Sequence, residues 1–468
     1  MPLLRPLVIA LAVLAIQFPP PAVDVDRSSA PQWLAPYREA SGRLIGEAMS
    51  SDAAWQRLAY LGDTYGNRLS GSPNLEAAIK WAVEEMKRDG LENVRAEPVK
   101  VPHWVRGRES LEIVGPIPQP LVMLGLGNSV GTPPAGIEAD LIVARSFDEL
   151  DAARDKVKGK IVLFNVPFTN YGETVQYRAR GAVAAAKVGA VGALVRSVTP
   201  YSQRTPHTGG MSYDSTVRRI PAAAITVEDA EMIHRLVDRG ERVRVTLEMS
   251  AKTLPDAPSR NVMGELVGSE KPDEIVVFGG HIDSWDVGRG AMDDGGGVVV
   301  AWEAVRLLKR LGLKPKRTIR VVGWTNEENG GRGGQAYRDA HRAEVDKHVL
   351  AIESDGGVFK PQGFSFTGSD AAVDMLKQIA LLLDRIDAGA MVKGGGGADI
   401  GPIMALGVPG LGLNVDGTKY FWYHHTDADT IDKLDPNDMA RCVAAMAVMA
   451  YVAADMPETL PRASAETR

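Results

Sequence analysis

The chain has almost no cysteine: Cys442 is the only one among its 468 residues. A single thiol allows no internal disulfide and cannot build a cysteine-rich zinc site. The HExxH sequence of single-zinc endopeptidases is also missing. Any metal site in this chain must therefore use histidine and carboxylate ligands, which bind zinc where thiolates are not available.

Several other functional signatures are missing too. The net charge is −6 and no basic run occurs, which argues against nucleic acid as a partner. The glycines at 394–397 lack the Lys and Ser/Thr of a phosphate-binding loop. The string GNSVG at 127–131 matches a serine nucleophile elbow, but the Thr-Pro-Pro that follows cannot begin the required helix. Nucleotide binding and serine hydrolysis are therefore disfavoured.

The amino terminus has an apolar run that is short for a membrane span. Arg5 precedes the run at 6–16, and three prolines follow at 19–21. A transmembrane helix needs about twenty apolar residues. We interpret residues 1–22 as a signal peptide. The mature protein is then expected to be periplasmic or secreted, without membrane contact after signal removal.

The length predicts more than one domain, since 468 residues exceed what one small core requires. We expect residues 23–115 and 256–468 to form one domain and residues 116–255 to form an insert. Within the insert, strands are predicted at 158–166, 190–198 and 243–249, and helices at 177–189 and 226–240. The insert begins near the Pro-rich stretch GPIPQP (115–120) and ends near a linker, KTLPDAPSR (252–260).

Four short apolar runs in the second half of the chain are typical of buried strands: 274–278, 318–324, 348–352 and 410–415. A helix is predicted at 298–311 between two of them, so strand and helix alternate and a mainly parallel sheet flanked by helices is expected. Each strand is followed by polar residues: His281, then Glu327 and Glu328, then Asp355, then His425. Since ligands gather at the carboxyl ends of parallel strands, these side chains are expected to meet.

These residue types suit a pair of zinc ions. Two metals that share one carboxylate need about five protein ligands and keep positions open for water. Asp293, in a glycine-rich stretch, completes a set of six candidates. Glu327 and Glu328 are adjacent and cannot point the same way, so one can bind metal while the other takes a proton from the activated water.

Several strings resemble the co-catalytic zinc exopeptidases, in particular the group of plasma glutamate carboxypeptidase, or carboxypeptidase Q. They are GGHIDSWDVGRGAMDDGGG (279–297), WTNEENGG (324–331), ESDGG (353–357), YFWYHHTDADT (420–430), YGNRLSGSPNLE (65–76) and PHWVRGRES (102–110). The resemblance covers nearly the whole mature chain. It implies the zinc exopeptidase fold, an inserted protease-associated domain that covers the active-site mouth or serves architecture, two Zn²⁺ ions and a possible homodimer.

The resemblance also assigns roles. It implies that His281 and Asp355 bind one zinc, that Glu328 and His425 bind the other, and that Asp293 bridges them, with the adjacent Asp294 as the alternative bridge. Glu327 falls on the general base of the family. Asp283 falls on an acid that supports the imidazole of His281.

Possible substrate contacts are Tyr420, Tyr423, His424 and Asp399, the last beside the glycines at 394–397. An exopeptidase must also anchor a free amine with an acid or a free carboxylate with a cation. The loops offer both kinds of residue: Asp286, Asp399 and Asp427 against Arg289, Arg332 and Lys419. The sequence does not choose between these two ends of the substrate.

The function that we expect is a zinc exopeptidase, acting as dipeptidase, aminopeptidase or carboxypeptidase on dipeptides or short peptides. Two alternatives share the fold. One is an aminoacyl cyclase of the glutaminyl cyclase type, which uses one zinc. The other is a non-catalytic binding protein, as in the transferrin receptor, against which the intact ligand set and Glu327 count.

Overall fold

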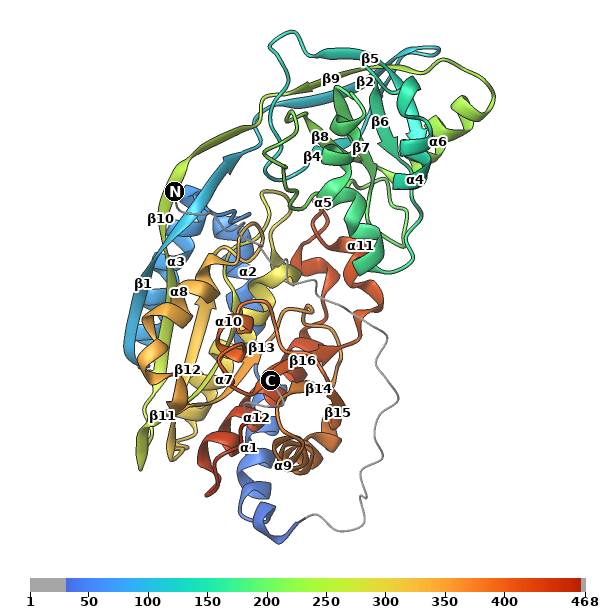
Figure 1. Ribbon diagram of the computed structural model, residues 1–468. Helices are drawn as coiled ribbons and strands as arrows, with labels where there is room; N and C mark the ends of the chain where they lie inside the picture. Colours follow the sequence, from blue (N-terminus) through green and yellow to red (C-terminus); the bar gives the residue numbers. More distant parts are fainter. Residues whose placement is uncertain (1–30, 464–468) are drawn as a thin grey trace, which may run out of the picture.

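The computed structural model describes residues 31–463, so the predicted signal peptide lies outside the described residues. The described chain folds around two eight-stranded sheets. Figure 1 shows the larger unit at the bottom and the inserted unit (green) at the top, joined by the long strands β1 and β10 along one edge. No helix in the described part of the chain is long and apolar enough to cross a membrane.

The sheet of the larger unit has the strand order β1-β10-β12-β11-β13-β16-β14-β15. Its centre is parallel: β11 pairs with β12 and β13, and β13 pairs with β16, in parallel. The expected mixed, mainly parallel sheet is therefore present. Its strands are β1 (Glu92–Val105), β10 (Lys252–Leu266), β11 (Lys271–His281), β12 (Arg317–Trp324), β13 (His348–Glu353), β14 (Pro361–Thr367), β15 (Ala390–Lys393) and β16 (Gly410–Val415).

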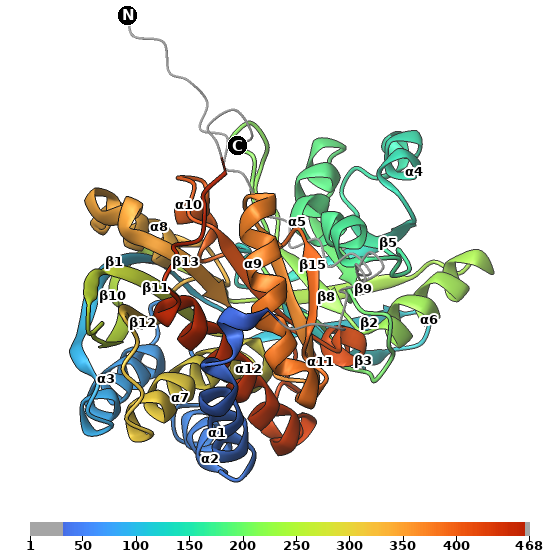
Figure 2. The same ribbon diagram turned by 90° about the horizontal axis from the view of Figure 1, so that it is seen from below.

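Helices cover both faces of this sheet because its central strands are apolar on both sides. In β11, Val276 and Phe278 join one core cluster and Ile275 and Val277 join the other, as the two-residue period of a strand requires. Figure 2 shows several helices gathered on one face. That face carries α1 (Tyr37–Met49), α2 (Ala53–Tyr65), α3 (Pro73–Arg88), α7 (Gly296–Arg310), α9 (Asp370–Ala380) and α12 (Pro436–Asp455); the opposite face carries α8 (Arg332–Ala340) and α10 (Gly401–Met404).

The inserted unit has its own sheet, in the order β3-β2-β9-β5-β6-β7-β8-β4, and its own apolar clusters. Its strands are β2 (Glu109–Gly115), β3 (Gln119–Leu121), β4 (Met123–Gly125), β5 (Ile137–Ala144), β6 (Ile161–Phe164), β7 (Gly192–Arg196), β8 (Ala222–Ile225) and β9 (Arg244–Met249). Its helices are α4 (Phe147–Ala152), α5 (Tyr171–Lys187) and α6 (Val227–Asp238). β2 lies before residue 116, where the insert is expected to begin, yet it pairs with β9.

Two predicted elements differ from the structure. Helix α5 begins at Tyr171 rather than near residue 177, because the side chain of Asn170 caps it by accepting from the amide of Glu173. The expected linker at 252–260 is instead the first part of β10, paired antiparallel with β1. Its prolines are tolerated because this part of β10 pairs on one side only, while β12 joins from Val262 onward.

Short helical segments complete the connections. The segment after β16 contains α11 (Tyr420–Tyr423), which leads directly into His424 and His425. The others are η1 (Gln32–Leu34), η2 (Arg154–Lys156), η3 (Ala291–Gly295), η4 (Arg342–Lys347), η5 (Leu381–Ile386), η6 (Gly417–Lys419) and η7 (Ile431–Lys433).

Candidate metal centre

Polar side chains meet at the carboxyl ends of the parallel strands. His281 is the last residue of β11, Glu327 and Glu328 follow β12, and Asp355 follows β13. His425 lies in the loop beyond β16 and α11. The fold thus brings together side chains that are up to 144 positions apart, from His281 to His425.

The first group of possible ligands is His281, Asp293 and Asp355. The Nε2 atom of His281 lies 3.3 Å from Oδ1 of Asp293 and 3.4 Å from Oδ1 of Asp355. All three side chains are at most 11% exposed. One histidine nitrogen and two carboxylates around a common point are a suitable donor set for a divalent cation.

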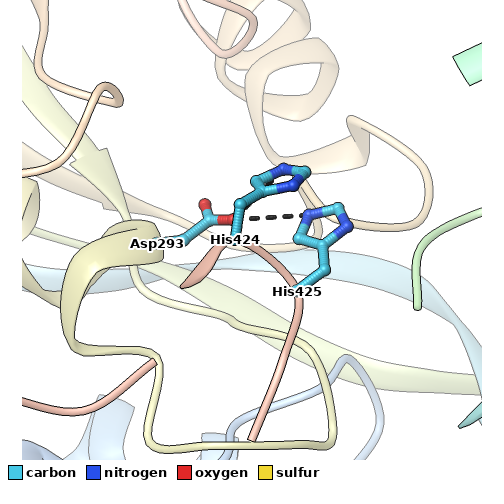
Figure 3. Close-up of side chains that lie close together, drawn as sticks. All are labelled: Asp293, His424 and His425. Carbon is cyan, nitrogen blue, oxygen red and sulfur yellow. Dashed lines mark ion pairs between the residues drawn. The ribbon is translucent and has the colours of Figure 1, made fainter. Parts of the chain in front are cut away.

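The second group surrounds His425. Its Nε2 atom lies 3.3 Å from Oδ2 of Asp293 and 3.0 Å from Oε2 of Glu328. His424 is stacked on His425 with ring centroids 3.5 Å apart, and its own Nε2 is 3.6 Å from Oδ2 of Asp293. Figure 3 shows both imidazoles beside the Asp293 carboxylate. His424 therefore faces the centre and is a possible additional ligand.

Asp293 belongs to both groups, with Oδ1 toward His281 and Oδ2 toward His425. This is the arrangement that a bridging carboxylate requires. Asp294 is engaged elsewhere: its Oδ2 accepts from the amide of His281 and its Oδ1 from the amide of Gly297. The geometry thus favours Asp293 over Asp294 as the bridge.

Two atoms of the centre have no hydrogen-bond partner among the described residues and are therefore available to bind a cation. Nε2 of His281 and Oδ2 of Asp293 are buried and accept or donate no hydrogen bond within residues 31–463. Burial lowers the pKa of His281, but the carboxylates of Asp293 and Asp355 outweigh it and raise that pKa well above the usual value. Burial lowers the pKa of His425, which favours its neutral, metal-binding form.

Asp283 organises both sides of the centre. Its main-chain carbonyl accepts from Nδ1 of His281 at 3.0 Å, which directs Nε2 toward the ligands. Its carboxylate accepts from the amides of Glu327 and Glu328, at 3.2 and 3.4 Å. The carboxylate itself lies 3.7 Å from the imidazole. Asp283 thus supports His281 chiefly through its backbone and uses its side chain to hold the two glutamates.

The two adjacent glutamates are placed by the turn after β12. Asn326 has a positive φ of 67°, which reverses the chain before Glu327. Oε1 of Glu328 accepts from the amide of Trp285 while Oε2 faces His425. Burial, followed by the charges of Asp355 and other acids, raises the pKa of Glu327 to about 8.

Sequence reasoning missed two residues that shape the loop carrying Asp293. The carboxylate of Asp429 accepts from the amides of Ala291, Met292 and Asp293, at 2.7 to 3.2 Å. The guanidinium of Arg68 is fully buried and donates to the main-chain carbonyls of the same region, namely Gly66, Ile282, Arg289 and Gly290. Both lie in strings that carry the family resemblance, but contacts to main-chain atoms leave no spacing signal.

The inserted unit reaches the second ligand group. Nδ1 of His425 donates to the main-chain carbonyl of Thr208 at 3.3 Å, and the amide of Thr208 donates to the carbonyl of His425 at 3.0 Å. Nη1 of Arg178 donates to the same Thr208 carbonyl at 3.2 Å. The insert therefore contacts a candidate metal ligand directly and helps to orient its ring.

The expected substrate contacts fall in different surroundings. Tyr420 is buried with its ring centroid 5.1 Å from that of His424, and burial and the charges of Asp293, Asp355 and Glu328 raise its pKa. Tyr423 instead packs on the helical core, with Nζ of Lys433 6.0 Å from its ring. Asp399 is buried, and neither of its carboxylate oxygens has a hydrogen-bond partner in the described chain.

Most of the candidate anchors for a substrate terminus are engaged or exposed. Asp286 forms an ion pair with Arg106, and Arg332 forms one with Asp256. The remaining candidates other than Asp399 are exposed: Arg289, Lys419 and Asp427.

Known proteins resemble both parts of the chain. Residues 261–450 match peptidase family M28, and residues 119–233 match the PA domain. Carboxypeptidase Q of Mus musculus is 48% identical over 432 residues, which cover 92% of each chain. Carboxypeptidase Q of Homo sapiens is 48% identical over 413 residues, 88% of each chain.

Solved structures agree with this relationship. A peptidase M28 precursor from Shewanella amazonensis is 37% identical with a TM-score of 0.88, over 91% of this chain and 99% of the other. BSAP, a zinc aminopeptidase from Bacillus subtilis, shares the fold at 19% identity and a TM-score of 0.66, over 87% of this chain and 95% of the other. The chain therefore belongs to peptidase family M28, in the carboxypeptidase Q group of metallo-exopeptidases with an inserted PA domain.

Proposed function

We propose that this protein is a two-zinc exopeptidase that hydrolyses dipeptides or other short peptides. The observation that carries the proposal is the Asp293 carboxylate, which lies between two separate groups of histidine and acid donors. His281 and Asp355 would hold one ion, Glu328 and His425 the other, and Asp293 would bridge them. When bound, the two ions supply Lewis acidity that lowers the pKa of a water and polarises a peptide carbonyl.

Glu327 is the proposed general base. Asp283 accepts from its amide, so the backbone of Glu327 is held beside the ligands. A raised pKa suits a carboxylate that takes a proton from water at its Oε atoms and gives it to the leaving amine. Bound cations would offset the charges of the neighbouring acids and return this pKa toward neutrality or below.

Asp399 is the proposed anchor for the free amine of the substrate. Its buried carboxylate lacks a hydrogen-bond partner in residues 31–463, whereas Asp286 is neutralised by Arg106. A panel of dipeptides, amino-blocked peptides and carboxyl-blocked peptides tests this assignment. We expect amino-blocking to abolish cleavage. Cleavage that survives amino-blocking but not carboxyl-blocking would show that the other end is anchored.

The decisive test of the proposed chemistry is Glu327→Gln. This change should lower kcat by at least about a thousandfold while leaving the metal content unchanged, because the base is lost and the ligands remain. Turnover and bound zinc are measured on the same preparation, and Glu270→Gln, at an exposed side chain, serves as the control. Full activity of Glu327→Gln would exclude it as the base. A stoichiometry of one zinc would favour the cyclase alternative.

Export is proposed from the amino-terminal segment. The mature protein should lack residues 1–22 and be recovered from the periplasm or the medium of an expressing bacterium. Amino-terminal sequencing of the processed chain checks this. A protein that keeps Met1 and stays in the cytoplasmic fraction would contradict the proposal.

A further inference from the structure

A tyrosine of the inserted unit packs directly against the loop that carries the candidate metal ligands. Tyr171, the first residue of α5, stacks on Phe421 with centroids 4.8 Å apart and meets the ring of His424 edge-on at 5.4 Å. His424 in turn stacks on His425 and lies 3.6 Å from Asp293. The contacts with the rings of Phe421 and His424 define the position of the Tyr171 ring.

The hydroxyl of Tyr171 accepts a hydrogen bond from Arg178, which lies about two helical turns further along α5. Nη2 of Arg178 donates to this hydroxyl at 2.8 Å, while Nη1 donates to the carbonyl of Thr208. Arg178 is only 6% exposed, and these two hydrogen bonds hold its guanidinium in place. Because the phenol oxygen accepts from Arg178, its own hydrogen remains available to another acceptor, and the adjacent cation makes it a stronger donor.

Arg178 links this hydroxyl to the second ligand group: its Nη2 donates to Tyr171, and its Nη1 lies 3.5 Å from Nδ1 of His425. Burial raises the pKa of Tyr171, Arg178 lowers it, and the carboxylates of Asp293 and Glu327 raise it again. The two carboxylates that act on it are the candidate bridge and the candidate base.

We propose that Tyr171 donates a hydrogen bond to the peptide oxygen that becomes negatively charged during hydrolysis, and that Arg178 is the positioning residue for Tyr171. This inference rests on the proposed peptidase function. It makes the inserted unit a contributor to the reaction itself, because a donor aimed at developing charge stabilises the transition state more than the bound substrate. No bond to Tyr171 forms or breaks in this role.

The test is Tyr171→Phe, which keeps both ring contacts and removes only the hydroxyl. We expect kcat on a dipeptide to fall by about 10²- to 10³-fold with KM changed by less than about threefold, as for removal of one oxyanion donor. Zinc content and thermal stability should stay at wild-type values. Tyr177→Phe is the matched control, since this tyrosine lies on the same helix but stacks on Phe147 inside the insert.

The role of Arg178 is tested by combining changes. With both zinc sites saturated, Arg178→Met should lower kcat at least as much as Tyr171→Phe. Adding Tyr171→Phe to it should then cost less than about threefold more, because the hydroxyl is already misplaced. Independent, multiplicative losses would overturn the positioning role. If Arg178→Met does not fold, Arg178→Lys provides the same comparison, since it keeps the charge but not the paired donors.

The outcomes separate this inference from the proposed function. An active, two-zinc wild-type enzyme whose Tyr171→Phe variant keeps kcat within threefold would overturn the inference alone. A rise in KM without loss of kcat would also overturn it, since the contact would then be made equally in the ground state. An inactive, zinc-free wild type would instead overturn the proposed function.

Discussion

The two ligand groups of the candidate metal centre are built by different means. His281 ends β11 and Asp355 follows β13, so neighbouring parallel strands place both. Glu328 and His425 lie in loops, and His425 has the strained positive φ of 61°. Each histidine donates from Nδ1 to a main-chain carbonyl, but His281 uses Asp283, two residues away, whereas His425 uses Thr208 of the insert.

The two ligand groups differ in what orients their histidines. The half around His281 is oriented by local chain geometry and the hydrogen bonds of the sheet. The half around His425 depends on how the inserted unit docks, since the acceptor that selects its tautomer is 217 positions away. Changes in the insert should therefore affect one ion more than the other.

The largest effects are expected from His281→Ala and His425→Ala. Each should remove the histidine donor of one group, weaken binding of that ion by more than about a hundredfold, and abolish most of the activity. Bound zinc after dialysis, measured by mass spectrometry, checks this. His234→Ala, within the insert and paired with Asp238, should keep both ions. Wild-type occupancy in both variants would remove these ligands from the proposal.

Gly280→Ala addresses the half that the sheet builds. An added Cβ would lie 2.1 Å from Oδ2 of Asp294 and 2.8 Å from the carbonyl of Ser354, so neither carboxylate nor backbone can remain in place. We expect a loss of about 1–3 kcal/mol in the free energy of unfolding, as for overpacking of a core. Urea unfolding of metal-free protein measures it. Gly417→Ala, where the added atom has no neighbour within 4 Å, is the control.

Gly209→Ala addresses the half that depends on the insert. Gly209 has a φ of 135°, and an added Cβ would lie 2.4 Å from Cζ of Arg178, so the guanidinium that donates to the Thr208 carbonyl must move. We expect about a tenfold weaker affinity for one ion and little change for the other. Competition with a chelator resolves the two affinities. Equal weakening of both ions would contradict the difference between the halves.

The smallest effect concerns a contact away from both halves. Burial alone would raise the pKa of Glu97, but the hydrogen bond and charge of His341, together with Arg95, lower it to about 2. Because the folded pKa lies below the usual value, this stabilisation is complete above about pH 4.5 and is lost as the pH falls toward 2. Glu97→Gln should slightly reduce the loss of unfolding free energy that accompanies a fall in pH from about 4.5 to 2. If the free energy of unfolding of this variant changes with pH as in the wild type, the contact between Glu97 and His341 contributes nothing to stability.

Much of the fold could be predicted because the central strands are apolar runs that end in polar residues. The strands around 274–278, 318–324, 348–352 and 410–415 are present as β11, β12, β13 and β16, and the predicted helix at 298–311 is α7. Parallel strands bring their carboxyl ends to one edge, so the convergence of His281, Glu328 and Asp355 followed from the pattern. The start of α5 and the strand character of 252–260 did not, since a cap and a one-sided pairing decided them.

The sequence by itself determined which side chains could bind metal, because histidine and carboxylate are the only strong donors that this nearly cysteine-free chain offers at its strand ends. Only the tertiary structure decided which position each of these side chains takes in the candidate centre. Asp293 rather than Asp294 is placed to bridge two ions, because one carboxylate faces the two histidines and the other accepts from main-chain amides. Likewise, the main-chain carbonyl of Thr208 accepts from both His425 and Arg178. Every residue has such a carbonyl, so only folding can select which one is close enough to accept.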